Sequence, residues 1–366
     1  MGPPPAAYLA WVAICVIWGT SYLAIKIALE TVSPLLITGL RYAAAGALLM
    51  VWVVARRQPL PSRRDWPGLV AVGLLTALYG VVFAAAQTDM KRLLAYSSIE
   101  NLGIVFTGVG LAIVYYGVGM PVPGTVALLA VLYHALNHAF MKSLLFLGTG
   151  AVLHATGERN LGRLGGLIHR MPWVAWLTLV GALAIAGLPP LNGFVSEWLL
   201  LQAFLFADTV PRPFINMLLP IGAALVALCA ALAGYVMVKF FGVIFLGQPR
   251  EPRLAQAHDA GPFERAGLVW LALACVTLGV LPVQVIGEFD QVSRALLGTG
   301  LGQGSTQWWL LAPTPARGAS YGPLAFLLAG GILTGLTVLG VRAVYHQRVR
   351  RGPAWDCGFV RLDARM

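Results

Sequence analysis

The chain has 366 residues, of which 58% are hydrophobic and only 11% charged, and its mean hydropathy is +0.78. This composition predicts a polytopic membrane protein and excludes a soluble all-α protein with a very apolar core, which would need far more charge between its helices. The net charge of +11 is not a nucleic-acid signal, because nearly all arginines lie between apolar segments, as topology-setting loop charges do.

Apolar segments follow one another along the whole chain, so we expect an all-α polytopic transmembrane helix bundle. About ten such segments lie near 8–29, 34–55, 67–86, 98–116, 122–154, 173–187, 193–207, 214–246, 263–286 and 321–345. The first has no basic residue before it and is followed by further spans, which predicts a signal anchor and not a cleaved signal peptide. We therefore expect a multi-pass protein of the inner (plasma) membrane, surrounded by the lipid bilayer.

The lysines are placed unlike the arginines. Lys26, Lys142 and Lys239 lie inside apolar segments, and Lys91 lies at the edge of one. Lysine loses its proton readily when it is desolvated, whereas arginine stays charged, so this arrangement suits proton exchange. A lysine near a helix end can instead extend its ammonium group to the membrane surface. That alternative fits Lys26 better than Lys142, which lies in the middle of its segment.

A polar block interrupts the apolar pattern after the third segment. It reads QTDMKRLLAYSSIEN, residues 87–101, and combines paired charges, hydroxyl groups and amides. On physical grounds alone this block is predicted to be a loop or an interfacial helix.

The most informative segment is 122–154, where His134, His138 and Lys142 follow at intervals of four residues. This spacing places the three side chains along one face of a helix, over a rise of about 12 Å. Ionisable residues are expensive to bury in a membrane and mark functional sites there, and two imidazoles and an ammonium group suit proton transfer. Because residues one turn apart are too distant for direct transfer, water would have to fill the gaps.

The sequence GLPPLNG at 187–193 predicts a broken helix, since two prolines and two glycines stand between apolar runs. Broken helices at membrane depth occur where protein or water satisfies the backbone, and transporters place ion sites there. Glu197 follows as the only carboxylate between Glu158 and Asp208. A tight turn between two spans is the alternative, with Glu197 as a favourable charge near a helix N-terminus.

Lys239 stands alone among aromatic residues in the run YVMVKFFGVIF, residues 235–245. It could pack against the rings as a cation–π pair, or it could belong to a proton relay. In such a relay a buried lysine and a carboxylate exchange a proton when a nearby charge moves, with histidine as an intermediate carrier. The predicted proton path consists of His134, His138, Lys142, Glu197, Lys91 and Lys239.

The four cysteines are isolated from one another, and no CxxC, HExxH, Walker A or dinucleotide-binding pattern is present in a fitting context. We therefore expect no metal site, no nucleotide or haem site, and no redox cofactor in this chain. We also expect no catalytic residue of its own.

Three runs resemble the antiporter-like membrane subunits shared by respiratory complex I, Mrp-type cation/proton antiporters and membrane-bound hydrogenases. They are KRLLAYSSIENLGI (91–104), LYHALNHAFMKSLLFLGTGAVLHATGERNLGRLGGL (132–167) and GLPPLNGFVSEWLLLQAF (187–204). The run VKFFGVIFLGQPR and the tail WDCGFVRLDARM look most like the B component of hydrogenase 4 and its formate hydrogenlyase relatives. The resemblance covers about residues 73–366. It implies that His134, His138, Lys142, Glu197 and Lys91 belong to the family's proton path.

The beginning of the chain resembles another family. The run WGTSYLAIK (18–26), the tripeptide LRY (40–42) and the loop 56–67 look like the start of an EamA-type drug/metabolite transporter, over about residues 8–72. We therefore expect an N-terminal fragment, 1–72, with two to three transmembrane helices. Residues 73–366 would form the C-terminal half of an antiporter-like domain. The intramembrane Glu and Lys that the family normally carries on earlier helices have no match before residue 73.

The resemblance implies a membrane subunit of a hydrogenase 4 or NADH-quinone oxidoreductase-like complex that moves protons or cations. Electron transfer would take place in other membrane and peripheral subunits, and no nucleic acid is expected as a partner. The alternatives are an EamA-type drug/metabolite transporter and a non-functional chimeric fragment.

The positions of the basic loops predict conflicting membrane orientations for residues 1–72 and 73–366. If Arg56–Arg64 faces the cytoplasm and 67–86 spans once, the basic residues at 91–92 and at 159–170 fall outside, against the positive-inside tendency. The orientation of the C-terminal third depends on whether 173–207 is one broken span or two, so it stays open.

Overall fold

The computed structural model describes most of the chain after residue 65. The described ranges are 66–206, 210–301, 308–313 and 320–345. The chain divides into two units, Met1–Ser62 and Arg63–Met366, and every described element belongs to the second. The predicted segments 8–29 and 34–55, the signal anchor and Lys26 lie outside the described residues.

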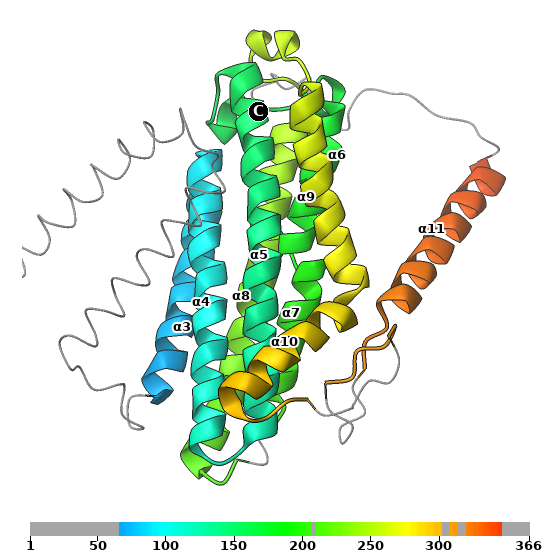
Figure 1. The fold of residues 1–366 in the computed structure, drawn as a ribbon. Helices are drawn as coiled ribbons and strands as arrows, with labels where there is room; N and C mark the ends of the chain where they lie inside the picture. Colours follow the sequence, from blue (N-terminus) through cyan, green and yellow to red (C-terminus); the bar gives the residue numbers. More distant parts are fainter. Residues whose placement is uncertain (1–65, 207–209, 302–307, 314–319, 346–366) are drawn as a thin grey trace, which may run out of the picture. The chain divides into compact units, whose positions relative to one another are not determined.

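The described residues form α-helices joined by short loops (Figure 1). The helices are α3 (Trp66–Ala86), α4 (Met90–Gly117), α5 (Pro121–Thr156), α6 (Pro172–Ile185), α7 (Asn192–Phe204), α8 (Pro213–Phe245), α9 (Pro262–Val280), α10 (Pro282–Leu297) and α11 (Pro323–Tyr345). Three short 3-10 helices lie in loops, η1 (Leu161–Arg163), η2 (Leu167–His169) and η4 (Pro252–Gln256). Within these ranges, six helices are long and apolar enough to cross a membrane: α3, α4, α5, α8, α9 and α11. The all-α, multi-pass class is confirmed, and the number of about ten segments is not.

Local sequence explains where these helices begin. Proline stands at the first turn of α5, α6, α8, α9 and α10, where its missing N–H costs nothing and its fixed φ suits a helix. Asp89 caps α4, because its side chain accepts hydrogen bonds from the backbone N–H groups of Lys91 and Arg92.

Two predicted boundaries are wrong. The polar block 87–101 is not a loop from Met90 onward, because there it forms the first turns of α4 and continues into the apolar part of that helix. Its residues Ser97, Glu100 and Asn101 are buried against other helices, which an isolated sequence cannot reveal. The apolar segment 263–286 is interrupted at Leu281, where α9 ends and the amphipathic α10 begins with Pro282.

Small residues bring α3 and α4 into close contact. A Cβ atom added at Gly80 would overlap the backbone of Glu100, and one added at Gly103 would overlap the backbone of Ala77. Such close backbone approach is how membrane helices gain packing energy without a hydrophobic driving force. The contact fixes the height of α4 along α3, and with it the position of the polar block.

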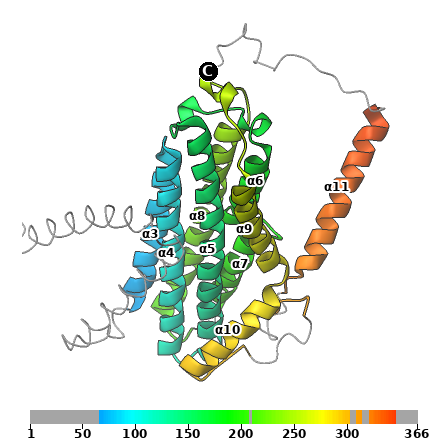
Figure 2. The same cartoon turned by 45° about the horizontal axis from the view of Figure 1, so that its top comes forward.

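The predicted helix break near 187–193 lies between α6 and α7. Gly187 has a φ of +66°, and the Pro189–Pro190 peptide bond is cis. Figures 1 and 2 show α6 and α7 following one another along α5. Gly181 of α6 packs against Leu144 and Leu145, whereas Ser196 of α7 reaches His134, two to three turns earlier on α5. The two helices therefore form one discontinuous span antiparallel to α5.

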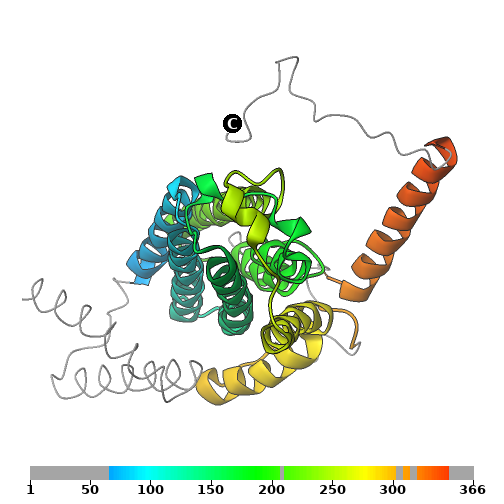
Figure 3. The same cartoon turned by 90° about the horizontal axis from the view of Figure 1, so that it is seen from above.

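Helix α5 lies between the α3–α4 pair and the α6–α9 pair when the bundle is seen along its axis (Figure 3). At one end of the bundle three loops are joined by backbone hydrogen bonds. Leu161 donates to Thr88, Met90 to Arg159, and Gly166 to Leu246. At the opposite end the hydroxyl groups of Tyr116, Thr125 and Thr299 meet within 2.6–3.1 Å.

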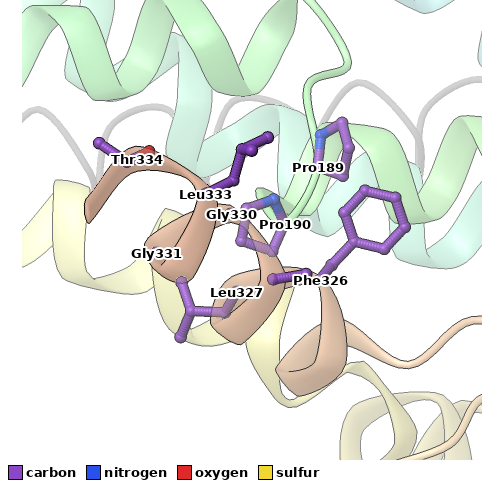
Figure 4. Close-up of a pocket in the computed structure, with 9 residues that line it drawn as sticks. Pro189, Pro190, Phe326, Leu327, Gly330, Gly331, Leu333 and Thr334 are labelled. Carbon is purple, nitrogen blue, oxygen red and sulfur yellow. The ribbon is translucent and has the colours of Figure 1, made fainter. Parts of the chain in front are cut away.

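The segment leading into α11 packs against α7 through aromatic rings. Tyr321 lies 5.1 Å from Phe194 and 5.9 Å from Trp198 between ring centroids. Beside this cluster, Pro189 and Pro190 of the helix break and residues of α11 line an open pocket of about 680 Å³ (Figure 4). No charged residue lines this pocket, so it is separate in character from the polar site below.

Candidate functional site

Lys142 is buried near the middle of α5, with 6% of its surface exposed. Its Nζ donates a hydrogen bond of 3.1 Å to the carbonyl oxygen of Leu94 on α4. A buried ammonium group held by one neutral carbonyl is costly in a membrane helix. The surroundings of Lys142 must therefore compensate its charge.

The face of α4 that meets α5 is polar. Ser97, Glu100 and Asn101 lie on it, and all three are buried, with Glu100 only 1% exposed. Ser97 Oγ donates to Glu100 Oε2 over 3.3 Å, and Asn101 Nδ2 donates to the Ser97 carbonyl over 2.8 Å. Because these residues are three and four apart, the helix gathers them on one side.

His134 connects this face to α7. Its Nε2 lies 3.1 Å from Asn101 Oδ1, and its Nδ1 lies 3.0 Å from Ser196 Oγ. Since an amide oxygen only accepts, Nε2 carries a proton, and in the neutral ring Nδ1 accepts from Ser196. When the ring is protonated, Nδ1 donates to Ser196 Oγ instead, and the hydroxyl can turn to the Gly193 carbonyl at 3.1 Å. Both charge states of His134 are thus hydrogen-bonded.

Two asparagines hold α5 against the start of α7. Asn137 Nδ2 donates to the Asn192 carbonyl over 2.8 Å, and Asn192 Nδ2 donates back to the Asn137 carbonyl over 3.5 Å. Within the described residues the side-chain oxygens of both asparagines are buried without a partner. Buried unpaired amide oxygens are places where ordered water is expected.

Glu197 lies on α7 beside the helix break, with 8% of its surface exposed. A Cβ atom added at Gly187 would stand 2.7 Å from Glu197 Oε2, so the carboxylate reaches back to the break. There it lies near the N-terminus of α7, whose free N–H groups and dipole favour a negative charge. Gly187 is required twice, for its positive φ and for the space it leaves.

The charges of the site act on one another. Glu100 interacts electrostatically with Lys142 and with Glu197, and His138 interacts with Lys142 and His134. The rings of His134 and His138 are nearly parallel, with centroids 6.3 Å apart. In the described part of the chain His138 Nε2 is buried and has no hydrogen-bond partner. The four predicted residues His134, His138, Lys142 and Glu197 therefore belong to one polar region.

The other two predicted residues lie elsewhere. Lys91 is exposed in the first turn of α4. Lys239 on α8 donates to the carbonyl oxygens of Ala85 and Gln87 over 2.7 and 2.8 Å, so it caps the C-terminus of α3. Their assignment to the proton path stays a prediction.

Sequence reasoning missed several residues of this region. They are Ser97, Glu100 and Asn101 on α4, Asn137 on α5 and Ser196 on α7. The available signal was the spacing of Ser97 and Asn101, which are one helical turn apart. That signal requires residues 90–101 to be helical, which the polar composition of the block does not suggest. Over the described ranges no group of three or more His, Cys, Asp or Glu residues could hold a metal ion.

Comparison with known proteins identifies related membrane subunits. Residues 28–219, just over half of the chain, match the family described as NADH:quinone oxidoreductase/Mrp antiporter, transmembrane. Hydrogenase-4 component B of Escherichia coli (strain K12) is 34% identical over 308 residues, which cover 80% of this chain and 44% of that protein. Formate hydrogenlyase subunit 3 of the same strain is 40% identical over 214 residues, covering 58% and 35%. The chain thus spans less than half the length of these two relatives.

A solved structure has a similar fold. It belongs to the membrane-bound sulfane sulfur reductase, an archaeal respiratory membrane complex, with a TM-score of 0.64 and 28% sequence identity. The match covers 80% of this chain and 44% of that chain. The match to the family begins at residue 28, so it includes part of the segment that resembles an EamA-type transporter.

Proposed function

Because this chain belongs to the NADH:quinone oxidoreductase/Mrp antiporter transmembrane family, we propose that it is a membrane subunit of a hydrogenase 4 or NADH-quinone oxidoreductase-like complex. It translocates protons, or other cations, and partner subunits carry out the coupled electron transfer. The observation that carries this proposal is the buried polar row from Lys142 and Glu100 through His134 to the helix break at Glu197.

Each residue of this row has its own role in proton transfer, which its surroundings set. Lys142 holds a proton in the middle of α5, where its burial makes release easy when a nearby charge moves. His134 takes up and releases a proton without losing a hydrogen bond, because Ser196 serves both states. Glu197 carries a proton at the break, where interrupted backbone admits water. Water links these groups, since neighbouring members lie too far apart for direct transfer.

The partners follow from the relatives. Hydrogenase-4 component B and formate hydrogenlyase subunit 3 are, by name, parts of larger assemblies, and the similar fold comes from a respiratory membrane complex. We infer that this chain joins other membrane and peripheral subunits in the inner membrane. Among the described residues α11 is exposed beyond Pro323, which leaves its apolar surface for lipid or a neighbouring subunit.

The experiment that tests this function compares proton pumping in inverted membrane vesicles that contain the assembled complex. We expect Lys142→Ala and Glu197→Gln each to abolish acidification measured with a pH-sensitive dye, while electron transfer and assembly persist. Glu288→Gln serves as a matched control, because Glu288 is an exposed carboxylate on α10. Pumping at the wild-type rate in both site variants would refute the proposal. Repeating the assay with and without sodium distinguishes proton from cation transport.

We also propose that an EamA-like fragment, 1–72, precedes the antiporter-like domain, 73–366. The sequence resemblance before residue 72 supports this boundary, and the division of the chain at Ser62 lies close to it. Mass spectrometry of native membranes tests whether the joined chain is made, through the tryptic peptide from Asp65 to Lys91. Its absence beside abundant peptides from 92–366 would contradict the fusion.

A further inference from the structure

Glu100 is a fully buried carboxyl group on α4. It is 1% exposed, and the hydrogen bond from Ser97 Oγ at 3.3 Å is the single one that it receives in the described part of the chain. A carboxylate in the middle of a membrane bundle with one weak donor is far from compensated. Such a carboxyl group is either part of a functional site or protonated for part of the time.

The backbone around Glu100 cannot move away from the site. At Gly80 of α3 there is no room for a Cβ atom beside the amide nitrogen of Glu100. The next residue, Asn101, is hydrogen-bonded to both Ser97 and His134. The carboxyl group therefore stays at the level of the polar row, and only its side-chain torsions are free.

Lys142 is bound to the same stretch of α4. Its Nζ shares the Leu94 carbonyl with Ser98 Oγ, which donates over 3.0 Å. Glu100 and Lys142 interact electrostatically, but no ion pair joins them among the described contacts. An ammonium and a carboxylate that attract each other without direct contact can exchange a proton through bridging water.

We propose that Glu100 is the acid–base partner of Lys142, a proton-carrying residue of this half of the site. The step transfers one proton: an N–H bond of the Lys142 ammonium breaks, an O–H bond forms on Glu100, and a bridging water relays the proton without net change. The ion pair becomes a neutral amine and a neutral carboxylic acid. Ser97 and Asn101 then connect Glu100 to His134. This inference rests on the proposed function and names a further residue for it.

The groups that face Glu100 come from three helices. Lys142 on α5 attracts its negative charge, Glu197 on α7 repels it, and the Cys229 thiol on α8 also interacts with it electrostatically. From α3, the backbone at Gly80 packs directly against the backbone of Glu100. Two carboxyl groups and one ammonium group leave one negative charge if all are ionised, so the site has room for one further proton. Protonation of Glu197 and of Glu100 is therefore coupled through charge.

The test uses the assembled complex in inverted membrane vesicles, with the variants Glu100→Gln, Glu100→Asp and Lys142→Ala. Thr107→Val is the matched control, since Thr107 is a buried polar residue two turns further along α4 that bonds only its own helix. Assembly is checked by native gel electrophoresis. We expect Glu100→Gln to slow pumping on the order of 10²-fold and to change its pH profile. Glu100→Asp should restore much of the rate, and Thr107→Val should pump normally.

A spectroscopic measurement separates proton carrying from a structural role. Infrared difference spectra between high and low pH should contain a protonated carboxyl band that is lost in Glu100→Gln and shifted in Glu100→Asp. If Lys142→Ala abolishes pumping but Glu100→Gln pumps with the wild-type pH profile and keeps that band, Glu100 has no such role. If Lys142→Ala pumps normally as well, the proposed function itself has failed.

Discussion

Single residues decide the chemistry of this site through the partners they have. Ser196 is a good example, because its hydroxyl can donate to His134 or turn to the Gly193 carbonyl. The imidazole can therefore be neutral or charged without leaving a buried group unpaired. Gly187 acts in another way, since it makes room for the carboxylate of Glu197.

Gly187→Ala should be more harmful than a similar change at another glycine with positive φ. The backbone conformation alone costs about 1–2 kcal/mol for a residue with a Cβ atom. At Gly187 the Cβ atom would also meet Glu197 Oε2 at 2.7 Å, whereas at Gly119, with a φ of +78°, it would meet nothing within 4 Å. We expect Gly187→Ala to lower both thermal stability in detergent and proton pumping. Gly119→Ala should lower stability only, and equal pumping in the two variants would contradict this account.

Glu158 makes the loop end of the bundle sensitive to acid. Burial raises its pKa, but the hydrogen bonds from the Asn160 and Arg159 backbone and the charges of Arg253 and Arg163 outweigh burial, so the pKa is lowered. Its contribution to stability is therefore present above the unfolded value of 4.5 and is lost as the pH falls through the lower folded pKa.

Thermal unfolding in detergent between pH 7 and pH 3 tests this sign. Wild-type protein should lose more stability on acidification than Glu158→Gln, in which the amide cannot be protonated in that range. Glu288→Gln, at an exposed carboxylate on α10, should follow the wild type. Parallel curves for Glu158→Gln and the wild type would show that this ion cluster does not set acid stability.

At the scale of elements, the contact between α3 and α4 positions the polar row. Gly80 and Gly103 remove the side chains that would separate the two backbones. The approach holds Glu100 opposite α5, where Asn101 reaches His134. The break between α6 and α7 positions the row from the side of α7. It brings Ser196 to His134 and leaves the Glu197 carboxylate beside Gly187.

Gly80→Ala should therefore destabilise the bundle, although alanine is the better helix former. Its methyl group would lie 2.8 Å from the Tyr96 carbonyl and overlap the Glu100 backbone, a strain of about 1–3 kcal/mol. Gly234→Ala on α8 is the matched control, since a Cβ atom there meets nothing within 4 Å. Thermal melting in detergent distinguishes the two variants. Equal melting temperatures would show that the close contact between α3 and α4 at Gly80 does not contribute to stability.

At the scale of the whole described bundle, the arginines gather at one end. This end is formed by the loops before α4, after α5 and after α8, which are hydrogen-bonded to one another. It carries Arg92, Arg159, Arg163, Arg170, Arg250, Arg253 and Arg265. At the opposite end the described loops and α10 carry Arg212 and Arg294. The positive-inside rule then places the arginine-rich end in the cytoplasm.

Cysteine labelling tests this orientation. In a background without the four native cysteines, Arg170→Cys should be protected from an impermeant maleimide in intact spheroplasts and labelled in inverted vesicles. Arg212→Cys, also exposed, should show the opposite pattern. Labelling of Arg170→Cys in intact spheroplasts would reverse the orientation. The sequence left the C-terminal third open, and the discontinuous α6–α7 span now gives its direction.

Much of the fold followed from the sequence, because a membrane helix needs little beyond a long apolar run and a boundary residue. The long apolar runs, the break at 187–193 and the His134, His138 and Lys142 row are local patterns of this kind. The helical start of α4 was missed, because polar residues in a helix are explained only by the helices that pack on them. The capping of α3 by Lys239 was missed for the same reason.

The sequence by itself determined the class of the protein, and it predicted where membrane helices and proton-carrying residues lie, since these predictions depend on side-chain type and spacing along one helix. Only the tertiary structure decided which of these residues meet. It joined His134 to Asn101 and Ser196, set Glu100 within electrostatic reach of Lys142 and left Lys91 exposed. The reason is physical: whether an ionisable side chain is buried and partnered depends on neighbouring helices, and no pattern within one helix specifies them.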